Sequence, residues 1–246
     1  MTSTPPRAKD VLLFRRRLSR WFARHGRDLP WRRTRDPYAV LVSEFMLQQT
    51  QVSRVAQFYP RFLERFSNLT VLARARPKAV REAWDGLGYY ARASNLHALA
   101  RQVSGVGGRV PDDPEELMKL PGVGRYTAGA VASFAYEKPV PAVDTNVARV
   151  IARVFLGTWG AGSGKKQLRN AECGVRNGKP GSRRIWEIAA LLVPKDGKRA
   201  WRFNQAIMEL GALVCTARHP KCRECPVLVV CRTGRSRCHS ERSEAK

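Results

Sequence analysis

The chain has 246 residues, enough for one large domain or two small ones with a buried core. Its 45 Lys and Arg outnumber 20 Asp and Glu, and the net charge of +25 favours a polyanion such as nucleic acid as partner. A ribosomal or membrane-surface protein is disfavoured by 43% hydrophobic residues in helically spaced runs. No run approaches the ~18 apolar residues of a membrane span, and the N-terminus has no apolar signal segment, which predicts an intracellular, cytoplasmic protein.

The apolar spacing predicts an all-α protein. The first helix is expected over residues 9–25, with one apolar face formed by Leu12, Leu13, Leu18, Trp21 and Phe22. Asp36-Pro37 predicts the start of the next helix, over 38–51, because Asp caps a helix and Pro suits its first turn. Later helices are expected over residues 52–66, 77–85, 90–103, 113–119, 125–136, 144–156, 185–193 and 200–214.

Two segments are not expected to be helical. Residues 157–184 are rich in Gly, Lys and Arg, which predicts that most of this stretch is a mobile basic loop. Residues 232–246 have no apolar pattern and are expected to be a disordered tail.

The segment SEFMLQQT, residues 43–50, places Glu44 and Gln48 one turn apart on a helix. Apolar neighbours could strip water from Glu44, raise its pKa and suit it to donate a proton near neutral pH. Taken alone, the motif fits a solvated glutamate on an amphipathic helix at least as well.

The segment LPGVGRYT, residues 120–127, has two glycines one residue apart just before a helix. Such a turn can aim backbone N–H groups at a DNA phosphate, and the flanking helices make it a helix-hairpin-helix. The alternative is an ordinary glycine-rich helix connection. In VDTNV, residues 143–147, Asp144 precedes an apolar helix and, as a bare motif, is typical of an N-cap.

Four cysteines stand at spacing C-x6-C-x2-C-x5-C, namely Cys215, Cys222, Cys225 and Cys231. Four thiolates in so short a segment suit one metal centre, either a [4Fe–4S] cluster or a tetrahedral zinc. A disulfide pair is the remaining alternative, which a reducing location disfavours.

Together these motifs resemble the helix-hairpin-helix DNA glycosylase superfamily and, within it, the MutY-type adenine glycosylases. The resemblance covers about residues 10–156 and 185–231. Its carriers, in family order, are RDLPW (27–31), SEFMLQQT, GLGYYAR (86–92), LPGVGRYTAGA (120–130), VDTNV, FNQAIMELGA (203–212) and the cysteine spacing. Endonuclease III shares the hairpin and cluster but has a lysine nucleophile at Tyr126. Thymine-mismatch glycosylases share the tyrosine, yet the Gln-Gln-Thr run fits MutY better.

The resemblance implies base-excision repair of adenine mispaired with guanine or 8-oxoguanine, after the base is flipped out of the duplex. Glu44 matches the acid that protonates adenine N7, and Asp144 matches the carboxylate that stabilises the oxocarbenium-like sugar. Tyr126 and Asn146 match residues that position Asp144 and water. Without the lysine, the enzyme is expected to be monofunctional.

The resemblance also implies the binding residues. The adenine pocket is matched by Arg27, Trp31 and Gln205, and the residues that enter the duplex by Gln48 and Tyr89. Further DNA contacts are expected from Gln49, Thr50, Gly122, Val123, Gly124 and Arg125. The family's [4Fe–4S] cluster is expected on Cys215, Cys222, Cys225 and Cys231.

The expected architecture has two lobes, with DNA across the cleft between them. Residues 31–140 form a six-helix module with the hairpin and Glu44, and residues 8–30 and 141–231 form the cluster lobe. Asp144-Thr145-Asn146 departs from the usual Asp-Gly-Asn, and the family's C-terminal MutT-related domain is expected to be absent. A monomer acting on double-stranded DNA with a mismatch is expected, in the cytoplasm at the nucleoid. The alternatives are a T/G or U/G mismatch glycosylase and a non-catalytic DNA-lesion binder.

Overall fold

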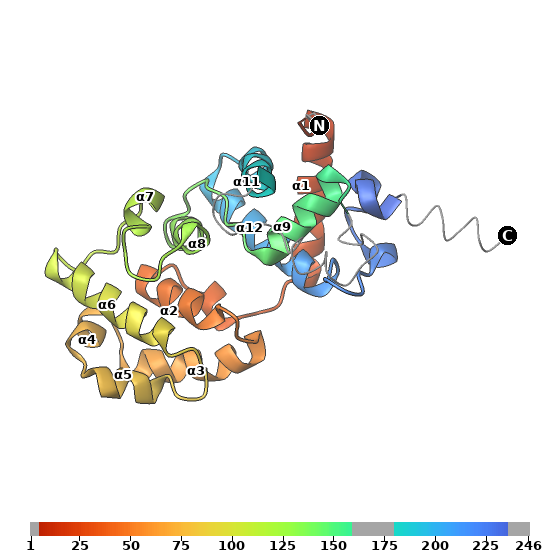
Figure 1. The fold of residues 1–246 in the computed structure, drawn as a ribbon. Coiled ribbons are helices and arrows are strands. Elements are labelled where there is room, and N and C mark those ends of the chain that lie inside the picture. Colours follow the sequence, from red (N-terminus) through yellow and green to blue (C-terminus); the bar gives the residue numbers. More distant parts are fainter. Residues whose placement is uncertain (1–4, 159–179, 236–246) are drawn as a thin grey trace. The chain divides into compact units, whose positions relative to one another are not determined.

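The computed structural model describes residues 5–158 and 180–235. Within these ranges the chain is largely helical and contains no β-strand, which confirms the predicted all-α class (Figure 1). The chain forms two compact units, the first comprising Met1–Arg27 with Pro139–Lys246 and the second Asp28–Lys138. None of the helices in the described ranges is both long and apolar enough to cross a membrane.

The first unit is assembled from both ends of the chain. Its elements are α1 (Ala8–His25), α9 (Thr145–Ile151), the π-helix η2 (Ala152–Leu156), α11 (Pro180–Leu192), α12 (Gly197–Leu213), η3 (Cys222–Glu224) and η4 (Leu228–Val230). Phe14 of α1 packs edge-on against Phe155 and Phe203, with ring centroids 5.2 and 6.2 Å away. The predicted apolar face of α1 is wrong at Leu12, whose side chain is 63% exposed. The residues of α1 that are buried in the core are Phe14 and Leu18.

In the second unit one helix is buried and several others pack against it. Its elements are η1 (Pro30–Arg32), α2 (Pro37–Leu47), α3 (Val52–Arg65), α4 (Leu69–Arg74), α5 (Pro77–Ala83), α6 (Ala91–Gly105), α7 (Pro114–Leu117) and α8 (Arg125–Tyr136). Helix α2 contacts α3, α6 and α8, and every residue from Tyr38 to Met46 is buried. The predicted start of α2 is confirmed, because the Asp36 carboxylate accepts hydrogen bonds from the backbone N–H groups of Tyr38 and Ala39.

Several helix ends differ from the expectation. Helix α2 stops at Leu47 rather than residue 51, since Gln48 leaves the helical conformation and Gln49 has a φ of +57°. The short α4 was not predicted, and it begins where the Asn68 side chain accepts a hydrogen bond from Val71 N at 2.9 Å. Helix α7 is a single turn instead of spanning residues 113–119.

The two segments expected to be irregular are partly ordered. Helix α11 begins at Pro180, so the basic-loop prediction is wrong from there to residue 184. Residues 232–235 form a helical turn, in which the buried Thr233 donates a hydrogen bond to Arg153 O at 2.8 Å. The disordered-tail prediction is therefore wrong for these four residues. The remainder of both predictions, on residues 159–179 and 236–246, lies outside the described residues.

Candidate active site

Glu44 lies in the middle of α2 and is only 3% exposed. Its sequence neighbours Ser43, Phe45 and Met46 are at most 1% exposed, and its own Oε2 atom is withdrawn from solvent. This burial excludes the reading of Glu44 as a solvated surface glutamate. A carboxyl group in such a place is suited to acid–base chemistry.

Gln48 is the C-cap of α2, one turn after Glu44: its φ of −59° is still helical, and its ψ of 110° turns the chain out of the helix. Gln49 follows with a φ of +57°, and Tyr89 has a φ of +47°, a conformation that non-glycine residues rarely adopt. Tyr89 is 63% exposed. Trp31 of η1 is buried and packs edge-on against Tyr59, with ring centroids 5.7 Å apart.

The predicted hairpin joins α7 to α8. Gly122 has a φ of +74°, and a Cβ there would stand 2.8 Å from Asn95 Cβ and 2.9 Å from Phe45 Cε1, so only glycine fits. Gly124 is the N-cap of α8, and a Cβ there would meet open space. The Val123 side chain is buried, which leaves its backbone as the part that could contact DNA. Tyr126 lies in the first turn of α8 and is partly exposed, and Arg125 beside it is exposed.

Asp144 is the N-cap of α9, as the bare motif predicted. Its Oδ1 accepts a hydrogen bond from Val147 N at 2.7 Å, and its Oδ2 accepts one from Asn146 Nδ2 at 2.8 Å. Asn146 in turn accepts from Arg149 Nη2 at 2.7 Å. Arg149 also donates to the backbone carbonyls of Gly211 and Cys215, each at 2.8 Å.

The hydrogen bonds of this network act against the effect of burial on Asp144. Burial raises the pKa of Asp144 above its usual value, while hydrogen bonds from Val147 and Asn146 and the charge of Arg149 each lower it. Both carboxylate oxygens are occupied by donors that orient the group. Asp144 can therefore serve as the cap of α9 and as a carboxylate held for chemistry.

Arg27 is held by a buried carboxylate on α12. Its Nε and Nη2 donate to Glu209 at 2.6 and 2.9 Å, and its backbone N–H donates to the same side chain at 3.0 Å. Glu209 is 1% exposed, and the hydrogen bond to it raises the pKa of Arg27. Gln205 is buried one turn before Glu209 on α12, so the two side chains share a helix face.

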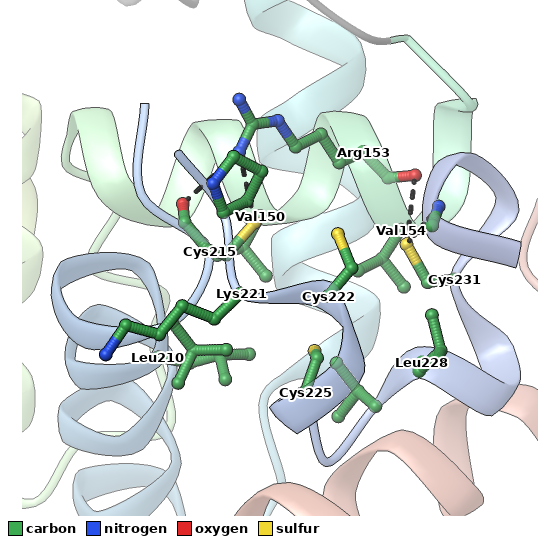
Figure 2. A pocket seen from close by; sticks show the side chains of 14 residues that line it. Val150, Arg153, Val154, Leu210, Cys215, Lys221, Cys222, Cys225, Leu228 and Cys231 are labelled. Carbon is green, nitrogen blue, oxygen red and sulfur yellow. Dashed lines mark hydrogen bonds between the residues drawn. The ribbon is translucent and has the colours of Figure 1, made fainter. Parts of the chain in front are cut away.

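The four cysteines line a single pocket of the first unit (Figure 2). Cys215 follows the end of α12, Cys222 opens η3, and Cys231 follows η4. Arg153 Nη1 and Nη2 donate to the carbonyls of Thr216 and Ala217 at 2.7 and 2.9 Å, which fixes the loop after Cys215. Gly234 N lies 3.2 Å from Cys231 Sγ and donates to it.

The donor set of this pocket fits a metal centre. Burial, together with the repulsion of the nearby Cys215, Cys222 and Cys231 thiolates, raises the pKa of Cys225 to about 12. A bound cationic metal would reverse that repulsion and hold the sulfurs as thiolates. Within the described chain none of the four cysteines is in a disulfide, and no group of three or more His, Cys, Asp or Glu is arranged to hold a metal ion.

The predicted residues are divided between the two units. In the first unit Asn146 donates a hydrogen bond to Asp144. In the same unit Arg27 donates to Glu209, on the face of α12 that also carries Gln205. The remaining predicted catalytic and DNA-contacting residues, Trp31, Glu44, Gln48, Gln49, Thr50, Tyr89, Gly122, Val123, Gly124, Arg125 and Tyr126, belong to the second unit.

Three charged residues that support these groups were not predicted. They are Arg92, Arg149 and Glu209. Arg92 on α6 and Glu209 on α12 are buried among apolar residues of the core. An isolated charge at a core-facing position was therefore the available sequence signal, because buried charges need partners.

The family comparison covers just over half of the chain. Residues 42–172 match the model described as "HhH-GPD superfamily base excision DNA repair protein". An adenine DNA glycosylase from Rattus norvegicus is 44% identical over 233 residues, which is 91% of this chain and 42% of the relative. The chain thus spans about two fifths of the length of that relative. A thymine-DNA glycosylase from Aeropyrum pernix is 39% identical over 220 residues, which is 88% of this chain and 92% of the relative.

Solved structures show the same fold. A thermostable thymine-DNA glycosylase superposes with a TM-score of 0.78 at 31% identity, covering 93% of this chain and 98% of that chain. An endonuclease III trapped in a covalent intermediate with DNA superposes with a TM-score of 0.73 at 25% identity, covering 95% and 99%.

Proposed function

This chain belongs to the HhH-GPD superfamily of base excision DNA repair proteins, and on that premise we propose that it is an adenine DNA glycosylase. It would hydrolyse the N-glycosidic bond of adenine mispaired with 8-oxoguanine or guanine. The observation that carries the proposal is the 44% identity over 233 residues to an adenine DNA glycosylase. The buried Glu44 and the oriented Asp144 supply two carboxyl groups with different environments, as hydrolysis of a glycosidic bond requires.

Glu44 is assigned as the general acid. Protonation of adenine N7 converts the base into a better leaving group. A protonated carboxyl group is more stable in an apolar interior than an ionised one, which suits Glu44 to this task. The same burial keeps bulk water away from the proton that is transferred.

Asp144 is assigned as the carboxylate that stabilises the cationic sugar left when the C1′–N9 bond breaks. The hydrogen bonds from Val147 and Asn146 stabilise its ionised form and hold it in place before the base leaves. Asn146 and Tyr126 are assigned to position Asp144 and the attacking water. A phenol cannot form the imine of a β-lyase, so Tyr126 supports base excision without strand cleavage.

The partner is proposed to be double-stranded DNA with a mismatch, bound by a monomer at the nucleoid. Arg27, Trp31 and Gln205 would receive the flipped adenine, while Gln48 and Tyr89 enter the duplex. The exposed Tyr89 ring is suited to replace lost base stacking. Phosphate contacts would come from Gln49, Thr50 and the hairpin, where Gly122, Gly124 and Arg125 are exposed.

A [4Fe–4S] cluster is the proposed cofactor, held by Cys215, Cys222, Cys225 and Cys231. A tetrahedral zinc with Zn–S bonds of ~2.3 Å needs its sulfurs ~3.8 Å apart, whereas in a cluster each iron takes one cysteine and the sulfurs stand farther apart. The four thiols that line one pocket support a shared metal centre, and the family resemblance favours the cluster. When bound, the cluster supplies a covalent cross-link between the segments on either side of η3.

Metal analysis tests the cofactor. Protein purified without oxygen is expected to be brown and to contain about four irons per chain. Cys222→Ser should lower iron content and DNA binding together, while Ser19→Ala, a substitution of a partly buried residue on α1, serves as the matched control. Stoichiometric zinc without iron would overturn the cluster.

A cleavage assay tests the activity. Purified protein is incubated with duplexes carrying A:8-oxoG, A:G, T:G or U:G, and abasic sites are then cut with alkali. We expect cleavage of the adenine strand in the first two duplexes, and only after alkali. Absence of adenine release from both would refute the proposal.

A thymine- or uracil-mismatch glycosylase is the second candidate. It is supported by the 39% identity that extends over 92% of a thymine-DNA glycosylase. The T:G and U:G duplexes of the same assay decide between the two functions. Specific binding to all four duplexes without excision would instead identify a lesion-binding protein.

A further inference from the structure

Two segments of the second unit stand out by their backbone strain. Gln49 and Tyr89 both have a positive φ, at 57° and 47°, although neither is glycine. Each strained residue belongs to one of the segments assigned to enter the duplex, Gln48–Thr50 and Leu87–Tyr89. Strain of this kind persists only where the surrounding structure enforces it, and it gathers at functional sites.

Both segments are bound by the same side chain, the guanidinium of Arg92. Its Nη1 donates to Gln48 O at 2.5 Å, and its Nη2 donates to Thr50 Oγ1 at 3.0 Å. On the other segment, Nη2 donates to Leu87 O at 3.0 Å and to Gly88 O at 3.1 Å. One planar group thus joins the residues before and after Gln49 to the two residues before Tyr89.

Arg92 also closes the end of α2. Its Nη1 donates to Phe45 O at 3.0 Å and to Met46 O at 2.7 Å, carbonyls that the last turn of a helix leaves without an intrahelical partner. This contact accounts for the early end of α2. It also ties the duplex-entering segments to the helix that carries Glu44.

The environment of Arg92 makes this link rigid. The residue is 7% exposed, and its guanidinium carbon lies 5.5 Å from the ring centre of Trp84 and 5.6 Å from that of Tyr89. Trp84 Nε1 donates to Gly88 O at 3.2 Å, and Arg54 Nε donates to Gly86 O at 2.5 Å, so the Tyr89 segment is also held from its other side.

We propose that Arg92 is a positioning residue for recognition, holding Gln48 and Tyr89 as one preformed wedge that enters the duplex as a unit. The proposal rests on the proposed function, because that function supplies the role of Gln48 and Tyr89. A lysine has one ammonium group and no planar fork, so it cannot reach acceptors on three segments at once. Without the Arg92 hydrogen bonds, the two strained residues relax to other conformations. Part of the free energy of binding DNA is then lost in ordering them when they enter the duplex.

The test compares Arg92→Lys with Arg101→Lys, an exposed arginine on the same helix α6. 2-Aminopurine beside the target base reports unstacking whether or not excision follows, in A:8-oxoG and T:G duplexes. We expect Arg92→Lys to reduce the fluorescence rise and to slow single-turnover excision roughly 5- to 100-fold, the range of one lost base–aromatic stack. Arg101→Lys should match the wild type.

A double-mutant cycle separates positioning from general damage to the fold. In a background that carries both Gln48→Ala and Tyr89→Ala, Arg92→Lys should slow excision by less than about threefold, because both residues it positions are gone. If Arg92→Lys does not fold, Thr50→Val, which removes one acceptor of Nη2, should show the same coupling to Tyr89 in weaker form.

Two results would overturn the proposal. They are wild-type unstacking by Arg92→Lys, and an equal loss of excision whether Gln48 and Tyr89 are both present or both replaced by alanine. If the wild type excises no adenine yet unstacks a duplex in a manner that depends on Arg92, the proposed adenine activity fails and the role of Arg92 stands.

Discussion

Glu44 and Asp144, the two carboxyl groups with proposed catalytic roles, have different surroundings. Glu44 is 3% exposed in the middle of a helix whose residues are buried from Tyr38 to Met46, so it is withdrawn from bulk water. The two carboxylate oxygens of Asp144 accept hydrogen bonds from Val147 and Asn146, which position the group and act against the effect of its burial. The proposed acid thus lies on a buried, mostly apolar helix, whereas the proposed carboxylate is surrounded by donors.

The comparison predicts different sensitivities in the two units. In the unit that carries Glu44, replacing its carboxyl group should abolish base excision while the fold remains. On the Asp144 side, changing a polar neighbour should alter stability or pH dependence, because polar contacts maintain the geometry there.

The largest effect is expected for Glu44→Gln. The amide cannot donate the proton to adenine N7, so single-turnover excision from an A:8-oxoG duplex should fall by about 10²–10⁴-fold. Binding to the same duplex should remain, because the amide has nearly the same shape as the acid. Glu64→Gln, at an exposed position on α3, is the matched control. Excision within a few-fold of wild type would remove Glu44 from the mechanism.

The next effect concerns the polar support in the first unit. Glu209→Gln leaves Arg27 without its counter-charge, and the free energy of unfolding should fall by about 1–3 kcal/mol, less than for a fully buried pair because Arg27 is 36% exposed. Urea denaturation measures this change. Asp28→Asn, which breaks an exposed ion pair with Arg33, should change stability little. Equal stability of Glu209→Gln and wild type would show that the α12 contact does not hold Arg27.

A smaller effect is expected on pH dependence. Burial raises the pKa of Asp144, and the Asn146 hydrogen bond lowers it, so Asn146→Ala should raise that pKa further. The active form is the carboxylate, which is lost as pH falls through the pKa. The acid limb of the single-turnover rate should therefore move to higher pH. Thr145→Ser, at the exposed neighbouring position, should leave the limb in place. A limb that moves to lower pH would contradict the assignment.

The smallest signal is expected from a gain of chemistry. Tyr126→Lys places an amine in the first turn of α8, and borohydride should then trap a weak protein–DNA adduct at the abasic site. Tyr126→Phe is the control, because it also lacks the phenol oxygen but cannot form an imine. Strong trapping by the wild type would show that another lysine acts as a nucleophile and that the enzyme is not monofunctional.

The features that depend on neighbours in sequence were predictable. Asp36-Pro37 predicted the start of α2, and Asp144 was expected as the cap of α9. In both helices the capping side chain accepts hydrogen bonds from backbone N–H groups only two or three residues later. The glycines of the hairpin were informative for a similar reason, since the turn at Gly122 needs a positive φ. The spacing of the cysteines likewise predicted that one pocket would gather them.

Other features were decided only by the tertiary structure. The end of α2 could not be predicted from residues 47–51. Its last carbonyl groups accept hydrogen bonds from Arg92, which lies 44 to 47 positions away in the sequence. Arg27 is held by Glu209, which lies 182 positions away in the sequence. The partner of a buried charge is set by which helices pack together, and no local spacing carries that information. The sequence by itself thus indicated most of the helices and the family, while packing decided which charged side chains support the proposed site residues.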